Sequence, residues 1–223
     1  KVVLEALKVK DAVVNLIIKE SAISNFSGLI ERLNDLIILV SDEVYNSLCF
    51  AVTPQDIMAV VKTNTNKALN INTNLIVLDR LQDPGNLGTI IRSSVASGHL
   101  DLVLINSVDP FNDKTVRSAS GTILYPNFYK MTPAEFVDFA TKNDLNVVVA
   151  DMNGKNIYDE KFEVKTPYAL VIGNEGQGVS NEIKKISKTT VSIPMDERVE
   201  SLNAGVSASI IMFNLTKGQK RGK

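Results

Sequence analysis

The amino-acid sequence predicts an α/β protein in which a small α/β domain precedes a larger domain with a mostly parallel sheet. Beyond residue 74, short β-branched apolar runs alternate with amphipathic stretches, as in strands that are joined by helices. The segment 62–73 has four Asn, three Thr and little apolar periodicity, so we expect a linker there. A length of 223 residues with 44% apolar side chains allows a buried core. The domains are therefore predicted at 1–61 and 74–223.

The first domain is expected to hold two buried strands with a helix between them. The strands are predicted at 12–18 and 36–40, where short β-branched runs are bounded by polar residues. Apolar side chains at helical spacing predict the helix over 25–34. A second helix is predicted to follow, with Ser41 or Asp42 as its N-cap.

The second domain is expected to alternate strands and helices. Strands are predicted at five apolar runs: 75–78, 102–105, 147–150, 169–172 and 190–193. Helices are predicted at four stretches: 86–97, 114–118, 133–142 and 203–215. A further short element is predicted at 183–187, and a basic tail, 217–223, ends the chain.

The composition excludes several classes of site. The 24 Lys and Arg nearly balance the 25 Asp and Glu, so no global charge attracts nucleic acid. The single cysteine, Cys49, excludes an internal disulfide and a CxxC zinc site, which fits a reducing cytoplasm. The single histidine, His99, is interpreted as a turn residue and leaves no metal site built from several histidines. No apolar run reaches the ~20 residues of a membrane span, so we expect a soluble, cytoplasmic protein. We expect no metal, because a single cysteine and a single histidine supply too few ligands. Because the sequence opens at Lys1 rather than Met, we expect that some N-terminal residues are missing.

Three loops follow predicted strands and concentrate Gly, Pro and uncharged polar residues, where a parallel sheet places its ligands. The first, 79–92, has a tight turn at Pro84-Gly85, a candidate helix N-cap at Asn86, and Arg92 six residues further. A helix turns 100° per residue, so Asn86 and Arg92 are about 120° from facing each other. They converge on one ligand only if the loop bends over the helix start. A turn with a solvated arginine is the alternative.

The second loop, 173–178, has three glycines in six residues. Glycine lets the backbone approach a ligand closely and leaves N–H groups available as donors. Unlike a dinucleotide-binding loop, it contains an acidic residue, Glu175, which would repel a phosphate. A ligand with positive charge or many hydrogen-bond donors fits better, and a purely structural glycine turn is the alternative.

The third loop leads into the last predicted helix. Ser201 or Asn203 can cap that helix, which carries small residues at 204, 205, 207, 208 and 209. Small side chains allow another backbone or a ligand to come very close. A helix that only fills a core would more often use Leu and Ile throughout.

In this order, the three loops closely resemble the three motifs of the SpoU (TrmH-type) branch of the SPOUT RNA methyltransferases. The matching segments are Asn86-Leu87-Gly88-Thr89-Ile90-Ile91-Arg92, Val171-Ile172-Gly173-Asn174-Glu175-Gly176-Gln177-Gly178, and Ile193-Pro194-Met195 through Ser201-Leu202-Asn203. The strong resemblance covers residues 74–216. Residues 1–61 are similar, with weaker motifs, to the ribosomal-protein-like RNA-binding domain that often precedes this catalytic domain.

The resemblance implies a parallel α/β domain with a deep trefoil knot that binds S-adenosylmethionine. By position, Gly173, Ile193 and Leu202 match residues that contact the cofactor, largely through the backbone. The polar residues of the family's active site match five positions: Asn86, Arg92, Glu175, Ser201 and Asn203. The implied reaction transfers the cofactor's methyl group to a ribose 2′-hydroxyl of RNA, with rRNA preferred over tRNA.

Within that reaction, Arg92 is expected to stabilise the negative charge that develops on the ribose oxygen. Its guanidinium stays charged and is therefore a poor proton acceptor. Glu175, an RNA phosphate or water could take the proton. Ser201 and Asn203 are expected to orient the ribose or Arg92.

The resemblance also implies a homodimer with its site at the subunit boundary. Local cations, rather than the net charge, are expected to contact RNA: Arg117 first, then Lys114, the cluster Lys184-Lys185-Lys188 and the basic tail. Two other classes stand beside this interpretation. The first is an RNA-binding protein that keeps the knot fold without catalysis, and the second is an NAD-dependent oxidoreductase, which lacks its glycine fingerprint here.

Overall fold

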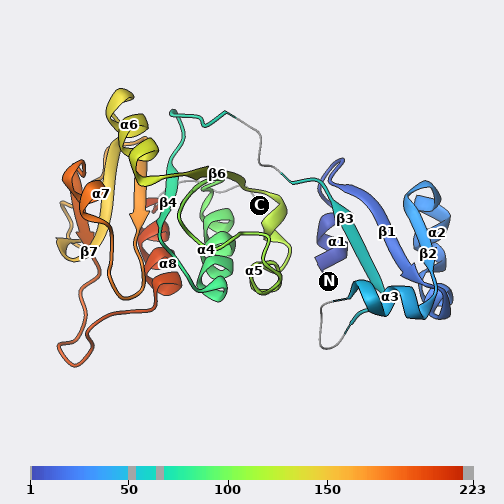
Figure 1. Ribbon diagram of the computed structural model, residues 1–223. Helices are drawn as coiled ribbons and strands as arrows, with labels where there is room; N and C mark the ends of the chain where they lie inside the picture. The colour runs from blue at the N-terminus through green and yellow to red at the C-terminus, as the bar shows by residue number, and fades with distance from the viewer. Residues whose placement is uncertain (1, 50–53, 64–67, 218–223) are drawn as a thin grey trace. The chain divides into compact units, whose positions relative to one another are not determined.

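The computed structural model describes residues 2–49, 54–63 and 68–217 (Figure 1). The chain divides into two compact units, Lys1–Thr63 and Asn64–Lys223, each described by itself below. Part of the expected linker, 64–67, and residues 218–223 of the basic tail lie outside the described residues.

The first unit contains a three-stranded sheet in the order β2-β1-β3. Strand β1 is parallel to β2 and antiparallel to β3. The strands are β1 Val13–Lys19, β2 Ile37–Val40 and β3 Ile57–Val61. The helices are α1 Val2–Ala6, α2 Ser27–Leu33 and α3 Asp42–Leu48, with 3-10 turns η1 Glu20–Phe26 and η2 Asn34–Leu36 on either side of α2.

The first two predicted strands and both predicted helices of this unit are confirmed. Ser41 is the N-cap of α3, since its Oγ accepts the Val44 N–H at 3.3 Å. The predicted helix over 25–34 is shorter because 3-10 turns replace its two ends. Strand β3 was not predicted, because its pairing with β1 is a tertiary contact that a short apolar run does not reveal by itself.

The second unit contains a six-stranded sheet in the order β6-β5-β4-β8-β7-β9, and all its strand pairs are parallel. The strands are β4 Leu75–Asp79, β5 Asp101–Ile105, β6 Asn127–Met131, β7 Asn146–Asn156, β8 Tyr168–Ile172 and β9 Thr189–Ser192. The helices are α4 Pro84–Ser97, α5 Asp113–Ala119, α6 Pro133–Lys142, α7 Asn181–Lys185 and α8 Ala204–Leu215, with a 3-10 turn η3 Thr122–Leu124. The predicted α/β class with a mostly parallel sheet is confirmed.

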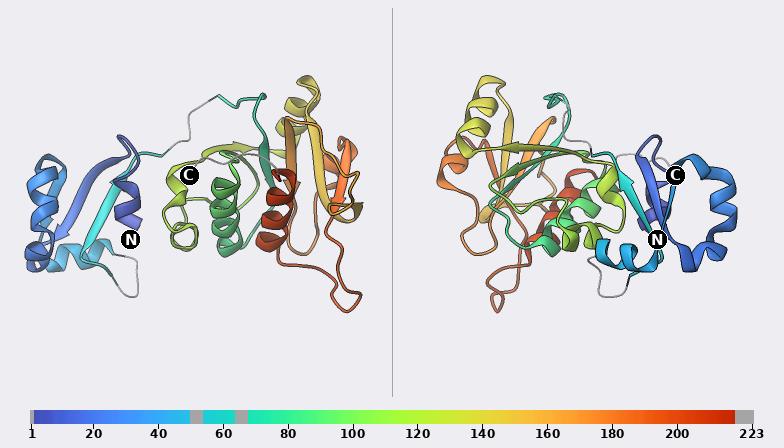
Figure 2. Two further views of the ribbon diagram at one scale, coloured as in Figure 1. Left: turned by 180° about the vertical axis from the view of Figure 1, so that it is seen from behind. Right: turned by 45° about the vertical axis from the view of Figure 1, so that its right-hand side comes forward.

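Helices cover both faces of this sheet (Figures 1 and 2). On one face, Phe136 and Ala140 of α6 and Ile183 of α7 pack with side chains such as Val77 and Val171. Successive strand residues point to opposite faces, so the alternate side chains face the layer that contains α4 and α8. Because both faces are buried, the central strands are continuous apolar runs, which is why the sequence located them well.

One prediction about the start of α4 is wrong in detail. Asp83, not Asn86, is the N-cap of α4: its Oδ1 accepts the Asn86 N–H at 2.8 Å, and Pro84 begins the helix. His99 directly follows the Gly98 turn that ends α4, and its side chain is buried, at 2% exposed. Its ring nitrogens lie 2.8 Å from the Ser97 hydroxyl and 2.7 Å from the Tyr168 hydroxyl, so it belongs to the interior.

Strand β6 was also not predicted, because the polar residues Asn127 and Lys130 interrupt its apolar pattern. Strand β7 extends well past the predicted end at residue 150. The predicted helix over 133–142 has the observed bounds, and a capping box between Thr132 and Glu135 fixes its start.

Candidate functional site

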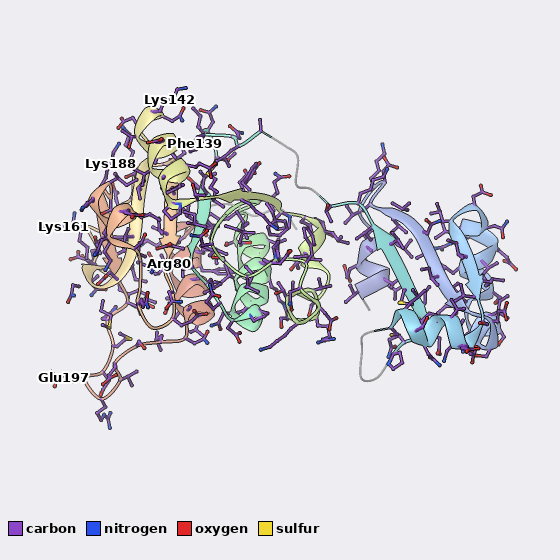
Figure 3. The ribbon with its side chains drawn as sticks, in the orientation of Figure 1. Arg80, Phe139, Lys142, Lys161, Lys188 and Glu197 are labelled. Carbon is purple, nitrogen blue, oxygen red and sulfur yellow. The ribbon has the colours of Figure 1, made fainter. Side chains whose placement is uncertain are left out.

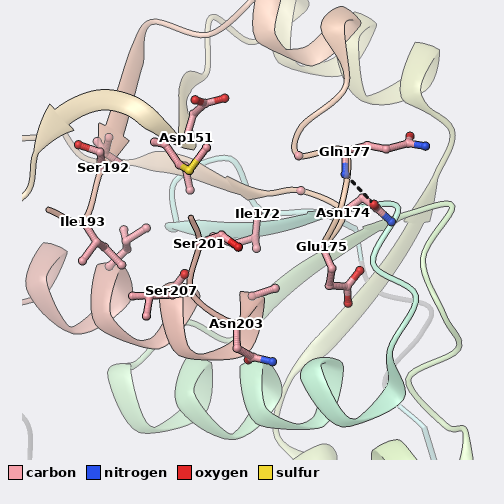
Figure 4. Close-up of a pocket in the computed structure, with 18 of the residues that line it drawn as sticks. Asp151, Ile172, Asn174, Glu175, Gln177, Ser192, Ile193, Ser201, Asn203 and Ser207 are labelled. Carbon is pink, nitrogen blue, oxygen red and sulfur yellow. Dashed lines mark hydrogen bonds between the residues drawn. The ribbon is translucent and has the colours of Figure 1, made fainter. Parts of the chain in front are cut away.

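The carboxyl-end loops of β8 and β9 meet residues 150–152 of β7 around one cavity of about 620 Å³ (Figure 4). The lining comes from the glycine loop 173–178, the end of β9, the loop before α8, and the inner face of α8. Six of the predicted site residues line it: Gly173, Glu175, Ile193, Ser201, Leu202 and Asn203.

A chain of hydrogen bonds joins the three predicted loops at the rim of this cavity. The Asn203 amide donates to Asn86 Oδ1 at 2.8 Å, and the Asn86 amide donates to Glu175 Oε1 at 3.0 Å. The residues are separated by 117 and 89 positions in the sequence, so the fold alone brings them together. We call this chain the Asn203–Asn86–Glu175 network.

Glu175 is fixed further by the backbone of the first loop. Its carboxylate accepts the N–H groups of Asp83 at 3.3 Å and Gln82 at 3.5 Å. Burial raises the pKa of this carboxyl, but the hydrogen bonds from Asn86 and from the backbone outweigh it, so the pKa lies below its ordinary value. Glu175 is therefore ionised at neutral pH and is a weak base.

The glycine loop is held in place by hydrogen bonds of one of its own side chains, that of Asn174. The Asn174 Oδ1 accepts the N–H groups of Gly176 and Gln177, both at 3.0 Å, and its amide donates to the Arg80 carbonyl at 2.9 Å. Gly173 tolerates no side chain, because an added Cβ would lie 2.2 Å from the Gly178 carbonyl carbon. The backbone of the cavity wall is thus preorganised.

Asn203 also begins helix α8. Its Oδ1 accepts the N–H groups of Gly205 and Val206 at 2.9 and 3.2 Å, so Asn203 and not Ser201 is the N-cap. The small residue at 205 lets α8 approach α4 closely, since a Cβ there would lie 3.1 Å from Thr89. The preceding loop extends away from the sheet, with Glu197 at its tip (Figure 3).

Three of the predicted cations, Arg92, Arg117 and Lys114, do not line the cavity. Arg92 is exposed on α4 and does not line the cavity, and its side chain makes no hydrogen bond or ion pair with any residue that the structure describes. Arg117 forms an ion pair with Asp113, and Lys114 forms one with Asp83 at 3.1 Å. The rotation of α4 between positions 86 and 92 separates Arg92 from the network.

Charge inside the cavity is mostly negative. Three carboxylates and one ammonium line it: Asp151, Glu175, Glu200 and Lys184. The Lys184 ammonium lies 2.6 Å from Asp151, and this hydrogen bond lowers the pKa of the Asp151 carboxyl. The cavity therefore suits a ligand with positive charge better than a phosphate.

The sequence alone did not identify Asp151 or Lys184 as residues of the cavity. It also did not predict that Asn174 organises the glycine loop. A possible signal was the position of Asp151 directly after a predicted strand, where parallel sheets place ligand contacts. Among the described residues, no group of three or more His, Cys, Asp or Glu could hold a metal ion. In the same part of the chain, no helix is long and apolar enough to cross a membrane.

Comparison with known proteins decides the family. The model of the SpoU rRNA Methylase family matches residues 73–213, which include all three loops. The chain belongs to the SpoU family. Its resemblance to this family in the loops 79–92, 173–178 and 193–203 is therefore confirmed.

Two of the relatives are described as 2′-O-methyltransferases of 23S rRNA. The chain is 31% identical over 179 residues to the 23S rRNA (guanosine(2553)-2′-O)-methyltransferase RlmP of Bacillus subtilis, with 79% of this chain and 71% of that protein covered. It is 33% identical over 156 residues to the 23S rRNA (uridine(2479)-2′-O)-methyltransferase of Streptomyces viridochromogenes, with 66% and 54% covered.

Among solved structures, the SpoU methyltransferase AviRb from Streptomyces viridochromogenes, in complex with the cofactor AdoMet, has a TM-score of 0.82. It is 26% identical, and the match covers 97% of this chain and 86% of that chain. The likeness to AviRb therefore includes both compact units of this chain.

Proposed function

We propose that this SpoU protein transfers a methyl group from S-adenosylmethionine to a ribose 2′-hydroxyl of RNA, with ribosomal RNA preferred over transfer RNA. The Asn203–Asn86–Glu175 network at the rim of the cavity carries this proposal, because it joins the three family motifs in one site. The relatives that methylate 2′-hydroxyls of 23S rRNA support the substrate class.

The cavity fits S-adenosylmethionine in size and charge. Ligand sites have volumes of about 300–1,000 Å³, and this cavity has about 620 Å³. Its apolar side chains suit an adenine ring: Ile172, Val191, Ile193, Leu202 and Ile211. The excess of carboxylates suits the cationic sulfonium. When bound, the cofactor supplies an activated methyl group, and Gly173, Ile193 and Leu202 are proposed to hold it through their backbone groups.

The protein's own side chains are proposed to orient the ribose and to compensate charge. Asn86, Ser201 and Asn203 present amide and hydroxyl groups at the rim, within reach of a ribose at the cavity mouth. Arg92 is proposed to stabilise the negative charge that develops on the 2′-oxygen. The lowered pKa of Glu175 favours a positioning role for this carboxylate, with the proton going to an RNA phosphate or to water.

We propose a homodimer in which α8 and α4 meet a second copy. Val206 and Phe213 of α8 are 44% and 42% exposed, and they lie on one face because seven residues make about two helical turns. Apolar side chains on an exposed helix face are typical of an interface between subunits. Arg92 lies on the neighbouring α4 and outside the cavity of its own subunit. We therefore propose that Arg92 serves the cavity of the second copy.

The knot and the role of the first unit are also proposals. The segment 193–203 runs along the glycine loop to line the same cavity, which supports the trefoil knot that the family resemblance implies. The likeness to AviRb extends over 97% of this chain, which supports an RNA-binding role for residues 1–61. Arg117 and Lys114 are proposed to contact RNA by exchanging their carboxylate partners for phosphates.

The function is tested by an assay of methyl transfer to total RNA from cells that lack the gene. The 2′-hydroxyl that becomes methylated is then mapped. We expect a site in ribosomal RNA, and Arg92→Ala is expected to abolish transfer while S-adenosylhomocysteine still binds. Arg198→Ala, which removes an exposed arginine that does not line the cavity, is the matched control. RNA binding without transfer would favour the inactive RNA-binding alternative instead.

A mixing experiment tests the dimer and the destination of Arg92. Arg92→Ala and Gly173→Ala are each expected to be inactive alone, the first without its cation and the second without its cofactor cavity. If Arg92 serves the partner's cavity, each mixed dimer regains one complete site, and a 1:1 mixture recovers about a quarter of wild-type activity. No recovery, with mixed dimers demonstrated, would place Arg92 in its own cavity.

A further inference from the structure

An ion pair lies inside the cavity, away from the Asn203–Asn86–Glu175 network. Asp151 follows the part of β7 that pairs with β8, and the Lys184 ammonium of α7 lies 2.6 Å from its Oδ2. Figure 4 shows Asp151 on the side of the cavity opposite Asn203. Both members of the pair line the cavity, and the side chain of Asp151 is 22% exposed and that of Lys184 is 39% exposed. A ligand in the cavity therefore reaches them.

The Asp151 carboxylate retains acceptor capacity after its internal contacts. Its Oδ2 accepts from Lys184 and its Oδ1 accepts the Asn153 N–H at 3.2 Å. A carboxylate has about four lone-pair sites, so both oxygens can accept further hydrogen bonds. Because Lys184 and Asn153 fix its orientation, a ligand donor meets a carboxylate that is already in place.

The neighbours of Asp151 indicate which part of the cofactor it meets. Ala150 pairs with Val191 in the sheet, and Ser192 and Ile193 follow on the same wall of the cavity. This wall is largely apolar and suits adenine, whereas the methyl group must face the network on the other side. The ribose, which is attached to adenine, is then the polar part next to Asp151.

We propose that Asp151 binds the ribose hydroxyls of S-adenosylmethionine and that Lys184 positions its carboxylate. The inference rests on the proposed function and deepens it. Two neutral hydroxyls can donate to the carboxylate without disturbing the ion pair. The charged amino-acid end of the cofactor would have to break the Lys184 contact to bind the same two side chains, at a desolvation cost.

Binding of S-adenosylhomocysteine, measured by calorimetry, tests the proposal without catalysis. Asp151→Asn is expected to weaken binding by about 10–100-fold, the range for hydrogen bonds to a charged group. Lys184→Met leaves the carboxylate in place but less fixed, so we expect a smaller loss. Asp144→Asn is the matched control, because it removes the Asp144–Lys188 ion pair outside the cavity. We expect no loss of affinity for that variant.

Two truncated ligands identify the contact. 5′-Methylthioadenosine keeps the ribose and lacks the amino-acid end, so Asp151→Asn is expected to weaken its binding as much as that of S-adenosylhomocysteine. The 2′,3′-dideoxy form of S-adenosylhomocysteine lacks the hydroxyls, and the variant and the wild type should bind it equally. If Asp151→Asn weakens only ligands that carry the amino-acid end, the assignment to ribose is wrong.

The outcomes separate this inference from the proposed function. If the wild type binds no S-adenosylhomocysteine, the proposed function itself fails. If the wild type binds and Asp151→Asn binds equally well, only the inference fails, and the ion pair merely joins α7 to β7. Unfolding of each variant without ligand excludes misfolding as the cause of a loss, and thermal stability within the range of the Asp144→Asn control is expected.

Discussion

Asn203 performs two tasks with the two ends of one amide, and two substitutions separate them. Its Oδ1 caps α8 through the N–H groups of Gly205 and Val206, and its amide nitrogen donates to Asn86. Asn203→Ala removes both contacts. Asn203→Asp keeps an oxygen for the cap and removes the donor, so that Asn86 faces the new carboxylate on one side and Glu175 on the other.

The contacts set the expected magnitudes. An N-cap contributes about 0.5–2 kcal/mol to the free energy of unfolding, and a neutral hydrogen bond contributes about 0.5–1.5 kcal/mol. Asn203→Ala is therefore expected to lower the free energy of unfolding by about 1–3 kcal/mol. Asn203→Asp is expected to stay within about 1 kcal/mol of the wild type, because a carboxylate also suits the positive end of a helix.

Methyl transfer should not follow stability in these two variants. Asn86 has one amide nitrogen and cannot donate to carboxylates on opposite sides, so Asn203→Asp misorients it although the protein stays folded. We expect transfer to fall at least about tenfold in both variants, which corresponds to about 1.4 kcal/mol of activation free energy. Urea unfolding and a methyl-transfer assay measure the two quantities. Full activity of Asn203→Asp would refute the role of the network, and equal stability of the two variants would refute the role of the cap.

Three further predictions concern the cavity and the proposed dimer. Gly173→Ala is expected to weaken S-adenosylhomocysteine binding at least about tenfold in calorimetry, because its Cβ would lie 2.2 Å from backbone across the loop; Gly176→Ala, whose nearest neighbour is 3.7 Å away, should bind normally. Lys184→Met is expected to destabilise the protein more at pH 7 than at about pH 3. The Lys184 hydrogen bond lowers the pKa of Asp151 from its ordinary 3.8, so its stabilisation is present above that value and is lost as the pH falls through the lowered pKa; urea unfolding at both pH values checks this. Val206→Glu is expected to halve the mass seen by light scattering, and an unchanged dimer would contradict the proposed interface.

Most of the second unit could be predicted because its elements depend on local patterns. The buried parallel strands are continuous apolar runs, and the helix over 133–142 has both its cap and its proline at the start. The three loops could be located as well, since glycine and proline mark them and they follow strands. Local sequence patterns were therefore almost sufficient to locate the family motifs.

The missed features depend on contacts between distant segments. Asn86 resembles an N-cap in the sequence, but Asp83 takes that role, so the Asn86 side chain is released to join Asn203 and Glu175. His99 follows a glycine with φ of 84° that ends α4, and Tyr168 of β8 provides the partner of its Nε2. No local pattern predicts a partner that is 69 residues away.

The near-zero net charge of the chain conceals a separation of charge that suits two ligands of opposite sign. Inside the cavity, Asp151, Glu175 and Glu200 outnumber Lys184, which favours a cationic sulfonium and disfavours an RNA phosphate. Outside it, Arg92 is exposed and has no partner among the described residues, which leaves its guanidinium available for RNA. An RNA methyltransferase of this kind needs its cofactor inside the cavity and its RNA outside it, with the rim of the cavity between the two. The amide network at that rim is neutral apart from Glu175, so it can orient a ribose between the two charge regions without attracting a phosphate into the cofactor cavity.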